Sequence, residues 1–400
     1  MDSNRGTGVR FQVSRVSEAA SLAAMVLVAL LLSGCRPHDF PQYPPNYREY
    51  AYVTNGGSDT VTVLDVVNVR IDRELAVGQH PVAVAASPTH NEIYVVNAGA
   101  AGANGSISVI DAEHNTVVAT ISVHRQPLSI DLDADGARAY VANSGSNSIS
   151  VIDLKARREI AQFGTGEGPV AARLAADGKT LVVANQAGNS VTVMDPADGH
   201  VRAVFGDCPG AAGPVILPDS SKAFVACSAG HQVMVIALAN SKARPNQPDA
   251  LEALMDVGRG PSHLALKPDG GEIFVSNSLS DSVSEIYNTT DEVGDTYMIG
   301  AEPVFGLVSP DNAFLYVANQ RSQEVTVYSI DDGKRVGSAH VGDGPAAMVF
   351  SAAGHLLFVA DSVSGDVAVV RTASPSQSLF TMLPAGRDPN SIVDKAFKVE

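Results

Sequence analysis

This chain of 400 residues contains no tryptophan, only three cysteines and few basic residues for its length. Its 27 lysines and arginines are outnumbered by 43 acidic residues, which gives a formal net charge of −16. Such a balance argues against nucleic acid as a partner, because nucleic-acid binding needs basic groups that displace counterions from phosphates. It also argues against direct adsorption of the folded surface onto anionic lipid.

Several chemical signatures are also missing from the sequence. It has no Cys-x-x-Cys-His for covalent haem, no Gly-x-Ser-x-Gly nucleophile motif and no phosphate-binding glycine loop. Its histidines do not show the close spacing that is typical of a zinc or copper site. We therefore predict no metal and no cofactor.

The only long apolar run lies near the N-terminus, at Ala19–Leu32, and its 14 residues follow a basic start. A membrane-spanning helix needs about 20 apolar residues, so this run is typical of a signal-peptide core. It ends in Leu-Ser-Gly-Cys35, which resembles the bacterial lipobox and implies a lipid on Cys35 after cleavage. An ordinary secretion signal is the alternative.

The sequence thus divides into a signal peptide (1–34), a lipidated cysteine with a Pro-rich tether (35–45) and a folded region (46–400). Residue 36 is arginine rather than aspartate, which by the lipoprotein sorting pattern implies the outer membrane. Several acyl chains on one cysteine would give stable anchoring. We expect a protein of the cell envelope that contacts the membrane through its lipid.

The folded region is organised around a run of an aromatic residue or Val followed by Val-x-Asn, which occurs eight times, twice with Cys or Asp in place of Asn, at spacings of 42, 46, 42, 42, 50, 42 and 42 residues. A fixed period in this range indicates a repeat architecture. The runs are Tyr52–Asn55, Tyr94–Asn97, Tyr140–Asn143, Val182–Asn185, Phe224–Cys227, Phe274–Asn277, Tyr316–Asn319 and Phe358–Asp361.

Each repeat contains four short β-rich runs separated by turn residues, and in six of the eight repeats the fourth opens after a Gly-x-x-Pro turn. Four antiparallel strands in about 42 residues match one blade of a β-propeller. The motif resembles that of the YVTN family of β-propellers over roughly residues 46–400. The resemblance implies the fold, whereas one fold hosts many activities.

The count of repeats predicts an all-β propeller with eight four-stranded blades, and seven is the alternative if one unit is degenerate. The folded region begins on a first-type run (Tyr47–Asn55) and ends on a fourth-type run (Pro389–Val399). We therefore predict that one blade combines three N-terminal strands with one C-terminal strand. Such closure removes exposed sheet edges.

Two repeats are longer than the others. The excess in one is Ala98–Gly105, and in the other it lies around Asn240–Ala250, which we expect to form a mobile loop. The alternation of strands places these insertions on opposite rims of the ring. The recurring asparagine is expected to cap its turn through neighbouring backbone groups rather than to bind a ligand.

Cys208 and Cys227 lie near the same rim of one repeat. An even pair in an oxidising compartment favours a disulfide, and two buried free thiols are the alternative. Four histidines lie towards the same rim: His80 and His124 just before fourth-type runs, His231 in a loop and His263 within a fourth-type run. We regard His80, His124 and His231 as candidates for a ligand-binding rim.

Asp131 and Arg173 each stand four residues after the proline that opens a fourth-type run, in adjacent repeats. Most other repeats have an apolar residue there, such as Ala85. We predict an ion pair near the central channel, and a structural pair is favoured over a substrate site. With His263, these residues are the candidates for catalysis.

Our first hypothesis is a non-enzymatic binding or scaffold protein, monomeric and lipid-anchored, that offers its rim or channel to a protein or a small molecule. The YVTN resemblance implies a second one, because related propellers include sugar lactonases: a lactonase-like hydrolase. A third is an accessory to a periplasmic quinone- or haem-dependent dehydrogenase. A hydrolase would need a base and an arginine to hold the developing oxyanion.

Overall fold

The computed structural model describes residues 42–239, 247–372 and 378–399. The leader, Cys35 and most of the tether lie outside these ranges, as does most of the predicted loop around Asn240–Ala250. Among the described residues no helix is long or apolar enough to span a bilayer. The folded unit begins at Tyr43.

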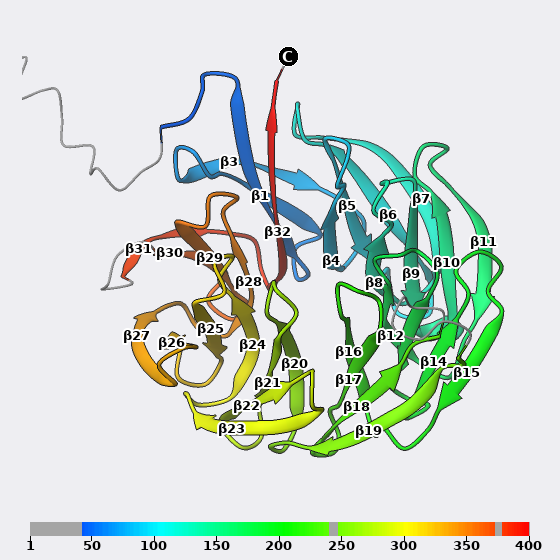
Figure 1. The fold of residues 1–400 in the computed structure, drawn as a ribbon. Helices are drawn as coiled ribbons and strands as arrows, with labels where there is room; N and C mark the ends of the chain where they lie inside the picture. The colour runs from blue at the N-terminus through cyan, green and yellow to red at the C-terminus, as the bar shows by residue number, and fades with distance from the viewer. Residues whose placement is uncertain (1–41, 240–246, 373–377, 400) are drawn as a thin grey trace, which may run out of the picture. The chain divides into compact units, whose positions relative to one another are not determined.

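The folded unit is a ring of eight blades, each a sheet of four antiparallel strands (Figure 1). We number the blades in chain order and list their strands from the channel outwards. Blade 1 is β32 (Pro389–Lys398), β1 (Tyr47–Asn55), β2 (Thr60–Asp65) and β3 (Arg70–Ala76). Blade 2 is β4 (Pro81–Ala86), β5 (Glu92–Asn97), β6 (Asn104–Asp111) and β7 (Thr116–Arg125).

Blade 3 is β8 (Pro127–Leu132), β9 (Arg138–Asn143), β10 (Ser148–Asp153) and β11 (Arg158–Gly164), with a 3-10 turn, η1, at Ser144–Ser146. Blade 4 is β12 (Pro169–Leu174), β13 (Leu181–Asn185), β14 (Ser190–Met194) and β15 (Val201–Phe205). Blade 5 is β16 (Ala211–Ile216), β17 (Lys222–Cys227), β18 (Gln232–Ala237) and β19 (Ala250–Asp256).

Blade 6 is β20 (Pro261–Leu266), β21 (Glu272–Asn277), β22 (Ser282–Tyr287) and β23 (Glu292–Met298). Blade 7 is β24 (Pro303–Val308), β25 (Phe314–Asn319), β26 (Glu324–Ser329) and β27 (Lys334–His340). Blade 8 is β28 (Pro345–Phe350), β29 (Leu356–Asp361), β30 (Asp366–Arg371) and β31 (Leu379–Pro384).

The predicted closure is confirmed, because β32 pairs with β1 along its whole length, from Tyr47 opposite Lys398 to Asn55 opposite Pro389. The last strand to be synthesised therefore completes the first blade (Figure 1). Without β32, the inner edge of β1 would present unpaired backbone groups. Ring closure thus depends on a contact between residues more than 330 positions apart.

The core lies between the blades. The aromatic residue of the repeat motif is fully buried in most blades, for example at Tyr52, Phe224 and Tyr316. One apolar cluster joins Tyr94 of blade 2 to Val141 of blade 3, so neighbouring blades share their buried surface. Valine, isoleucine and alanine supply the rest of this packing in a chain without tryptophan.

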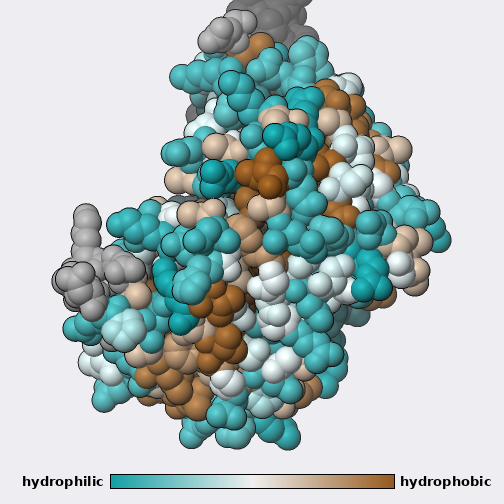
Figure 2. Space-filling model, turned by 90° about the vertical axis from the view of Figure 1, so that its right-hand side faces the viewer, coloured by the Kyte–Doolittle hydropathy of each residue, from teal (hydrophilic) through white to brown (hydrophobic). Residues whose placement is uncertain are grey.

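The outer strands carry scattered apolar residues on a mostly polar wall. Figure 2 views the side of β7, β11 and β15, where small hydrophobic areas are separated by hydrophilic ones. The exposed apolar residues there include Val118, Ile160 and Val204. Single exposed apolar side chains of this kind are normal on soluble domains.

The recurring asparagine bonds neighbouring backbone in several blades, as we expected, but it also makes a contact that we did not expect. In six blades its buried Nδ2 donates to a serine or threonine hydroxyl on the next strand, at 2.8–3.0 Å. Some of these side chains also bond the backbone, as Asn143 does to the carbonyl of Val141. A cross-strand bond thus accompanies the backbone contacts, because the hydroxyl points into the same buried space.

In five of these six blades, a glycine three residues before the inner strand makes room for this arrangement, and blade 3 has His124 there. A Cβ on Gly78 would fall 2.7 Å from Cγ of Asn97, and one on Gly300 would fall 2.3 Å from Cγ of Asn319. The Gly-x-x-Pro turn therefore passes directly over the asparagine side chain. We call the end of the ring where the inner strands begin the upper rim, and the opposite end the lower rim.

Candidate functional site

The inner strands of the eight blades, β4, β8, β12, β16, β20, β24, β28 and β32, surround the central channel (Figure 1). Apolar residues predominate on them, as in Pro-Val-Ala-Val-Ala-Ala of β4. Charged or titratable side chains on these strands are therefore departures from the repeat. The sequence candidates Asp131, Arg173 and His263 are three of them, on β8, β12 and β20.

Asp131 and Arg173 form the predicted ion pair, with 3.1 Å between Nη1 of Arg173 and Oδ1 of Asp131. The other carboxylate oxygen accepts the backbone N–H of Leu174 at 2.7 Å. Asp131 is thus held by two groups of blade 4. Half of the Arg173 side chain remains exposed, at 53%. The aspartate orients the guanidinium, and the guanidinium keeps donors for another partner.

His263 lies in the gap between blades 6 and 7. Its Nδ1 accepts the backbone N–H of Gly306 at 3.3 Å, and its ring stacks on Phe305 with centroids 4.0 Å apart. Because Nδ1 accepts, the neutral ring carries its proton on Nε2. Burial, together with the positive charge of Arg173, lowers the pKa of His263 to about 4. The ring is therefore neutral at pH 7.

The effect of Arg173 on the pKa of His263 places the two groups within electrostatic reach of each other, two blades apart. Asp131 and Arg173 are thus in direct contact, whereas His263 packs against blade 7. Chemically they offer a half-exposed guanidinium and a neutral imidazole that donates from Nε2. Both groups favour an anionic or carbonyl-bearing ligand.

The three rim histidines do not converge. His124 lies 3.2 Å from Glu159, and His231 lies 3.6 Å from Asp256 on an exposed part of blade 5. His80 borders a pocket on the upper rim that the lengthened loop of blade 2 also lines. Among the described residues no three His, Cys, Asp or Glu side chains gather as metal ligands would.

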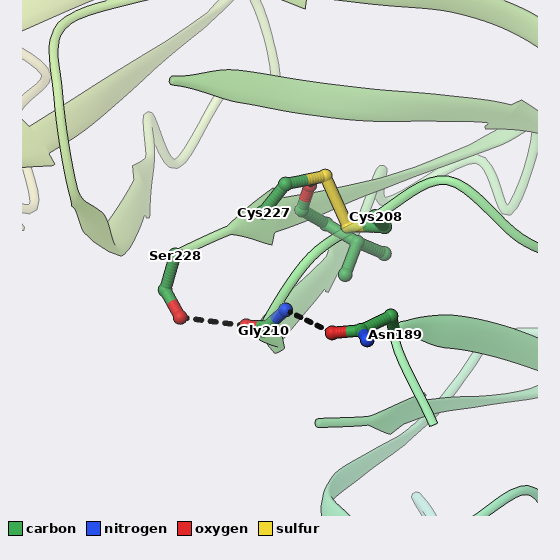
Figure 3. The surroundings of a disulfide bond; sticks show 6 residues. Asn189, Cys208, Gly210, Cys227 and Ser228 are labelled. Carbon is green, nitrogen blue, oxygen red and sulfur yellow. Dashed lines mark hydrogen bonds between the residues drawn. A yellow bond between two sulfur atoms is a disulfide. The ribbon is translucent and has the colours of Figure 1, made fainter. Parts of the chain in front are cut away.

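Cys208 and Cys227 form the predicted disulfide, with their Cα atoms 4.7 Å apart (Figure 3). Gly210 lies beside it, and its N–H donates to Oδ1 of Asn189 in the preceding blade at 2.9 Å. Its carbonyl accepts the hydroxyl of Ser228 at 2.6 Å. The disulfide therefore fixes the upper end of blade 5, where that blade meets blade 4.

Two buried carboxyl pairs escaped the sequence analysis. Asp361 of blade 8 is fully buried next to Asp366, and burial and this neighbour raise its pKa to about 8. Asp394 of β32 lies beside Glu49 of β1, and burial together with Glu49 raises the pKa of Asp394 to about 9. Asp361 and Asp394 therefore keep a proton at neutral pH, because burial and a neighbouring carboxyl group both disfavour the charged form.

One of these pairs could have been found from the repeats themselves. Asp361 replaces the recurring asparagine, and Ala368 stands where six other repeats have a hydroxyl. Glu49 and Asp394 gave no such signal, because they meet only when the two chain ends pair. Glu49 also accepts the N–H of Ala352 in blade 8 at 2.7 Å, so this pair connects the closing blade to its neighbour.

Comparison with known proteins gives a family and a fold. The family model described as "Lactonase, 7-bladed beta-propeller" matches residues 46–217 and 215–382. No curated protein matches the sequence. Among solved structures, hydrazine synthase of Kuenenia stuttgartiensis is similar, with 25% identity and a TM-score of 0.55 over 70% of this chain and 91% of that one.

Two further structures share the fold. The dihydro-heme d1 dehydrogenase NirN, solved in complex with DHE, is 16% identical with a TM-score of 0.68 over 90% of this chain and 77% of that one. A candidate 6-phosphogluconolactonase from Bacteroides uniformis is 16% identical with a TM-score of 0.58 over 88% of this chain and all of that one, 100%. At such identities the likeness concerns the fold alone.

Proposed function

The chain belongs to the lactonase family of β-propellers, and from that premise we propose that it is a binding protein that captures an anionic small molecule in its channel. The observation that carries this proposal is Arg173, which Asp131 orients and which keeps half of its side chain exposed near the neutral ring of His263. A carboxylate suits this pair, because it can accept from the guanidinium and from Nε2 of the imidazole.

Binding is favoured over catalysis because neither Asp131 nor His263 is suited to act as a general base. Both oxygens of Asp131 already accept hydrogen bonds, and one of them pairs with Arg173. The low pKa of His263, about 4, makes its neutral ring a weak base at pH 7. A general base works best when its pKa lies near the working pH. The cluster is therefore better suited to hold an anion than to activate water.

Hydrolysis of a lactone is the second candidate, and the family match favours it. Arg173 would then stabilise the oxyanion that develops on the carbonyl, which is a common use of a fixed cation. Titration calorimetry with small carboxylates, such as malate and benzoate, and an assay of gluconolactone hydrolysis separate the two candidates. Binding without turnover supports the first candidate, and turnover that depends on Arg173 supports the second.

The matched control for Arg173→Ala is Arg321→Ala. Arg321 also pairs with an aspartate, Asp281, at 2.8 Å, and its side chain is 61% exposed, but it lies on the upper rim rather than on an inner strand. The proposal predicts at least a tenfold loss of carboxylate affinity in Arg173→Ala and none in Arg321→Ala. Equal effects in the two variants, or no binding of any carboxylate to the wild type, would refute it.

We further propose that lipid on Cys35 holds this binding protein in the cell envelope, at the outer membrane. The lipobox-like Leu-Ser-Gly-Cys35 and the arginine after it support this location. Cys35→Ser should move the protein from the membrane fraction to the soluble fraction and prevent labelling with radioactive palmitate. A variant that stays in the membrane fraction would exclude a lipid anchor.

A further inference from the structure

A pocket of about 450 Å³ opens on the upper rim between blades 2 and 3. Its walls are His80 before β4, the loop Ala98–Ala103 after β5, Arg125 and Gln126 before β8, and Gly145 of η1. A volume of this size lies within the range of ligand sites, about 300–1,000 Å³. Asp131, Arg173 and His263 of the channel site do not line this pocket.

The pocket depends on an insertion that blade 2 alone contains. Asn97 of β5 pairs with Ser106, nine positions later. In the other seven blades the corresponding partners are five positions apart, as with Asn55 and Thr60. The four extra residues form the small-residue loop that closes one side of the pocket. Added chain on one face of a repeat protein commonly carries binding.

The loop is fixed to the rim, and it presents backbone donors. The N–H groups of Ala98 and Gly99 donate to the carbonyls of His80 and Gln79 at 2.9 and 3.0 Å. The N–H groups of the next three residues, 100–102, donate to no other group within the described part of the chain. Free backbone donors in a tight turn suit an anion.

The remaining walls add positive charge. The guanidinium of Arg125 has no ion pair with any described residue, and no Asp or Glu lines the pocket. Nδ1 of His80 donates to the carbonyl of Gly56 at 3.0 Å, which holds the imidazole at the wall of the pocket.

Two residues of the pocket are not glycine although their backbone has the positive φ that glycine adopts most easily. The residue before each inner strand has a positive φ in all eight blades, and in four of them it is glycine. His80 and Gln126 occupy this position with φ of 51° and 52°. Left-handed backbone is unfavourable for residues with a Cβ. Both polar side chains thus stand at the pocket despite a local conformational cost.

We propose that this pocket binds the oxyanion of a small soluble metabolite, a carboxylate or a phosphate. The fork of Arg125 and the free N–H groups of the loop hold the oxygens, and His80 lines the same pocket. This site is separate from the channel, so it does not rest on the function proposed for Arg173. Carboxylate and phosphate share the required chemistry, because both accept two parallel hydrogen bonds from arginine.

Titration calorimetry with glucuronate and with inorganic phosphate, at constant ionic strength in chloride, tests the site. Arg125→Ala should weaken binding at least tenfold. The matched controls are Arg259→Ala and Arg387→Ala, because both arginines occupy the same repeat position and bond a serine in the same way as Arg125. These controls should bind both probes as the wild type does, and Arg173→Ala should bind phosphate as the wild type does.

Two further variants keep the proposal falsifiable. Removing residues 100–103 restores the common loop length and should abolish binding while the circular dichroism spectrum is unchanged. Gln126→Gly relieves backbone strain, so it should raise thermal stability while it weakens binding.

Binding of either probe with this pattern of variants supports the site and identifies which oxyanion it prefers. The proposal is overturned if neither probe binds the wild type, or if Arg387→Ala weakens binding as much as Arg125→Ala. It is also overturned if Arg173→Ala alone abolishes binding, since the anion would then occupy the channel.

Discussion

Six blades hold the upper end of the second strand by a bond from asparagine to hydroxyl, whereas blades 5 and 8 use different chemistry at the same place. In blade 5, Cys227 replaces the asparagine, Cys208 replaces the glycine above it and Met234 replaces the hydroxyl. In blade 8, Asp361 replaces the asparagine, and its neighbour is Asp366 because Ala368 has no hydroxyl.

The comparison shows that every blade bonds this position to its surroundings. Whether the bond is a hydrogen bond, a disulfide or a carboxyl pair decides how the blade responds to redox potential and to pH. A hydrogen bond between neutral groups is insensitive to redox potential and to pH. The disulfide makes blade 5 sensitive to reduction, and the acid pair makes blade 8 sensitive to pH. Both candidate sites also lie where the sequence departs from the repeat: the channel site at charged residues on inner strands, and the rim pocket at the lengthened loop of blade 2.

The largest effect is expected where the ring is joined, since blade 1 is the only one built from both chain ends. Deleting residues 389–400 removes β32 and leaves β1 with an open edge. We expect the melting temperature to fall by more than 10 °C, because a whole strand and its buried contacts are lost. A synthetic peptide of residues 389–400 should restore part of the loss, and an unchanged melting temperature after deletion would contradict closure.

The disulfide should be next in size. Replacing both Cys208 and Cys227 by serine should lower the free energy of unfolding by about 3 kcal/mol, the value typical of a loop of this length. Denaturant titration measures the loss. The informative companion is Cys208→Gly with Cys227→Asn and Met234→Thr, which installs the set found in the regular blades. It should recover about 1 kcal/mol, and no recovery would show that the sets are not equivalent.

The acid pair of blade 8 should make stability depend on pH. The pKa of Asp361 rises from an ordinary 3.8 to about 8, so the folded protein keeps a proton that the unfolded chain releases. Stability therefore falls as pH rises from about 4 to about 8, with a slope of up to about 1.4 kcal/mol per pH unit.

Asp361→Asn with Ala368→Thr replaces the acid pair by the asparagine–hydroxyl bond of the regular blades. The loss of unfolding free energy between pH 6 and pH 8 should then be about 2 kcal/mol smaller than in the wild type. Unfolding curves at both pH values measure the difference. The contribution of Asp394 remains in both proteins, so it cancels in the comparison. Parallel curves for the two proteins would show that Asp361 is not protonated in the folded state.

The smallest effect concerns a regular blade. Asn143→Ala removes a bond of 2.9 Å to the hydroxyl of Ser150, and a double-mutant cycle with Ser150→Ala isolates the pair. We expect a coupling energy of about 1 kcal/mol, since a net hydrogen bond in a protein has about that value. A coupling energy near zero would show that the asparagine fills space at this position but gains no stability from the hydrogen bond.

The architecture followed from the sequence because strand patterns and turn residues recur at a fixed period, and the pairing of Tyr47–Asn55 with the chain end followed from counting. The ion pair of Asp131 with Arg173 was predictable, since both stand at one repeat position. The bond from asparagine to hydroxyl was missed, because spacing alone does not show which groups face one buried space. The meeting of Glu49 with Asp394 depends on closure geometry.

The candidate sites were predictable only in part. His263 was singled out as a titratable residue on an inner strand, but its neutral state follows from packing against Phe305 and Gly306. Arg125 gave no signal, because arginine also occupies the same repeat position at Arg259 and Arg387. Only the fold shows that the lengthened loop faces Arg125 rather than the other two.

The most direct test of the proposed channel site is a crystal structure with a small carboxylate that binds the protein, such as malate. The account predicts electron density for the carboxylate against the guanidinium of Arg173 and within hydrogen-bond distance of Nε2 of His263. Density only on the upper rim at Arg125, with Arg173 contacting nothing but Asp131, would contradict it.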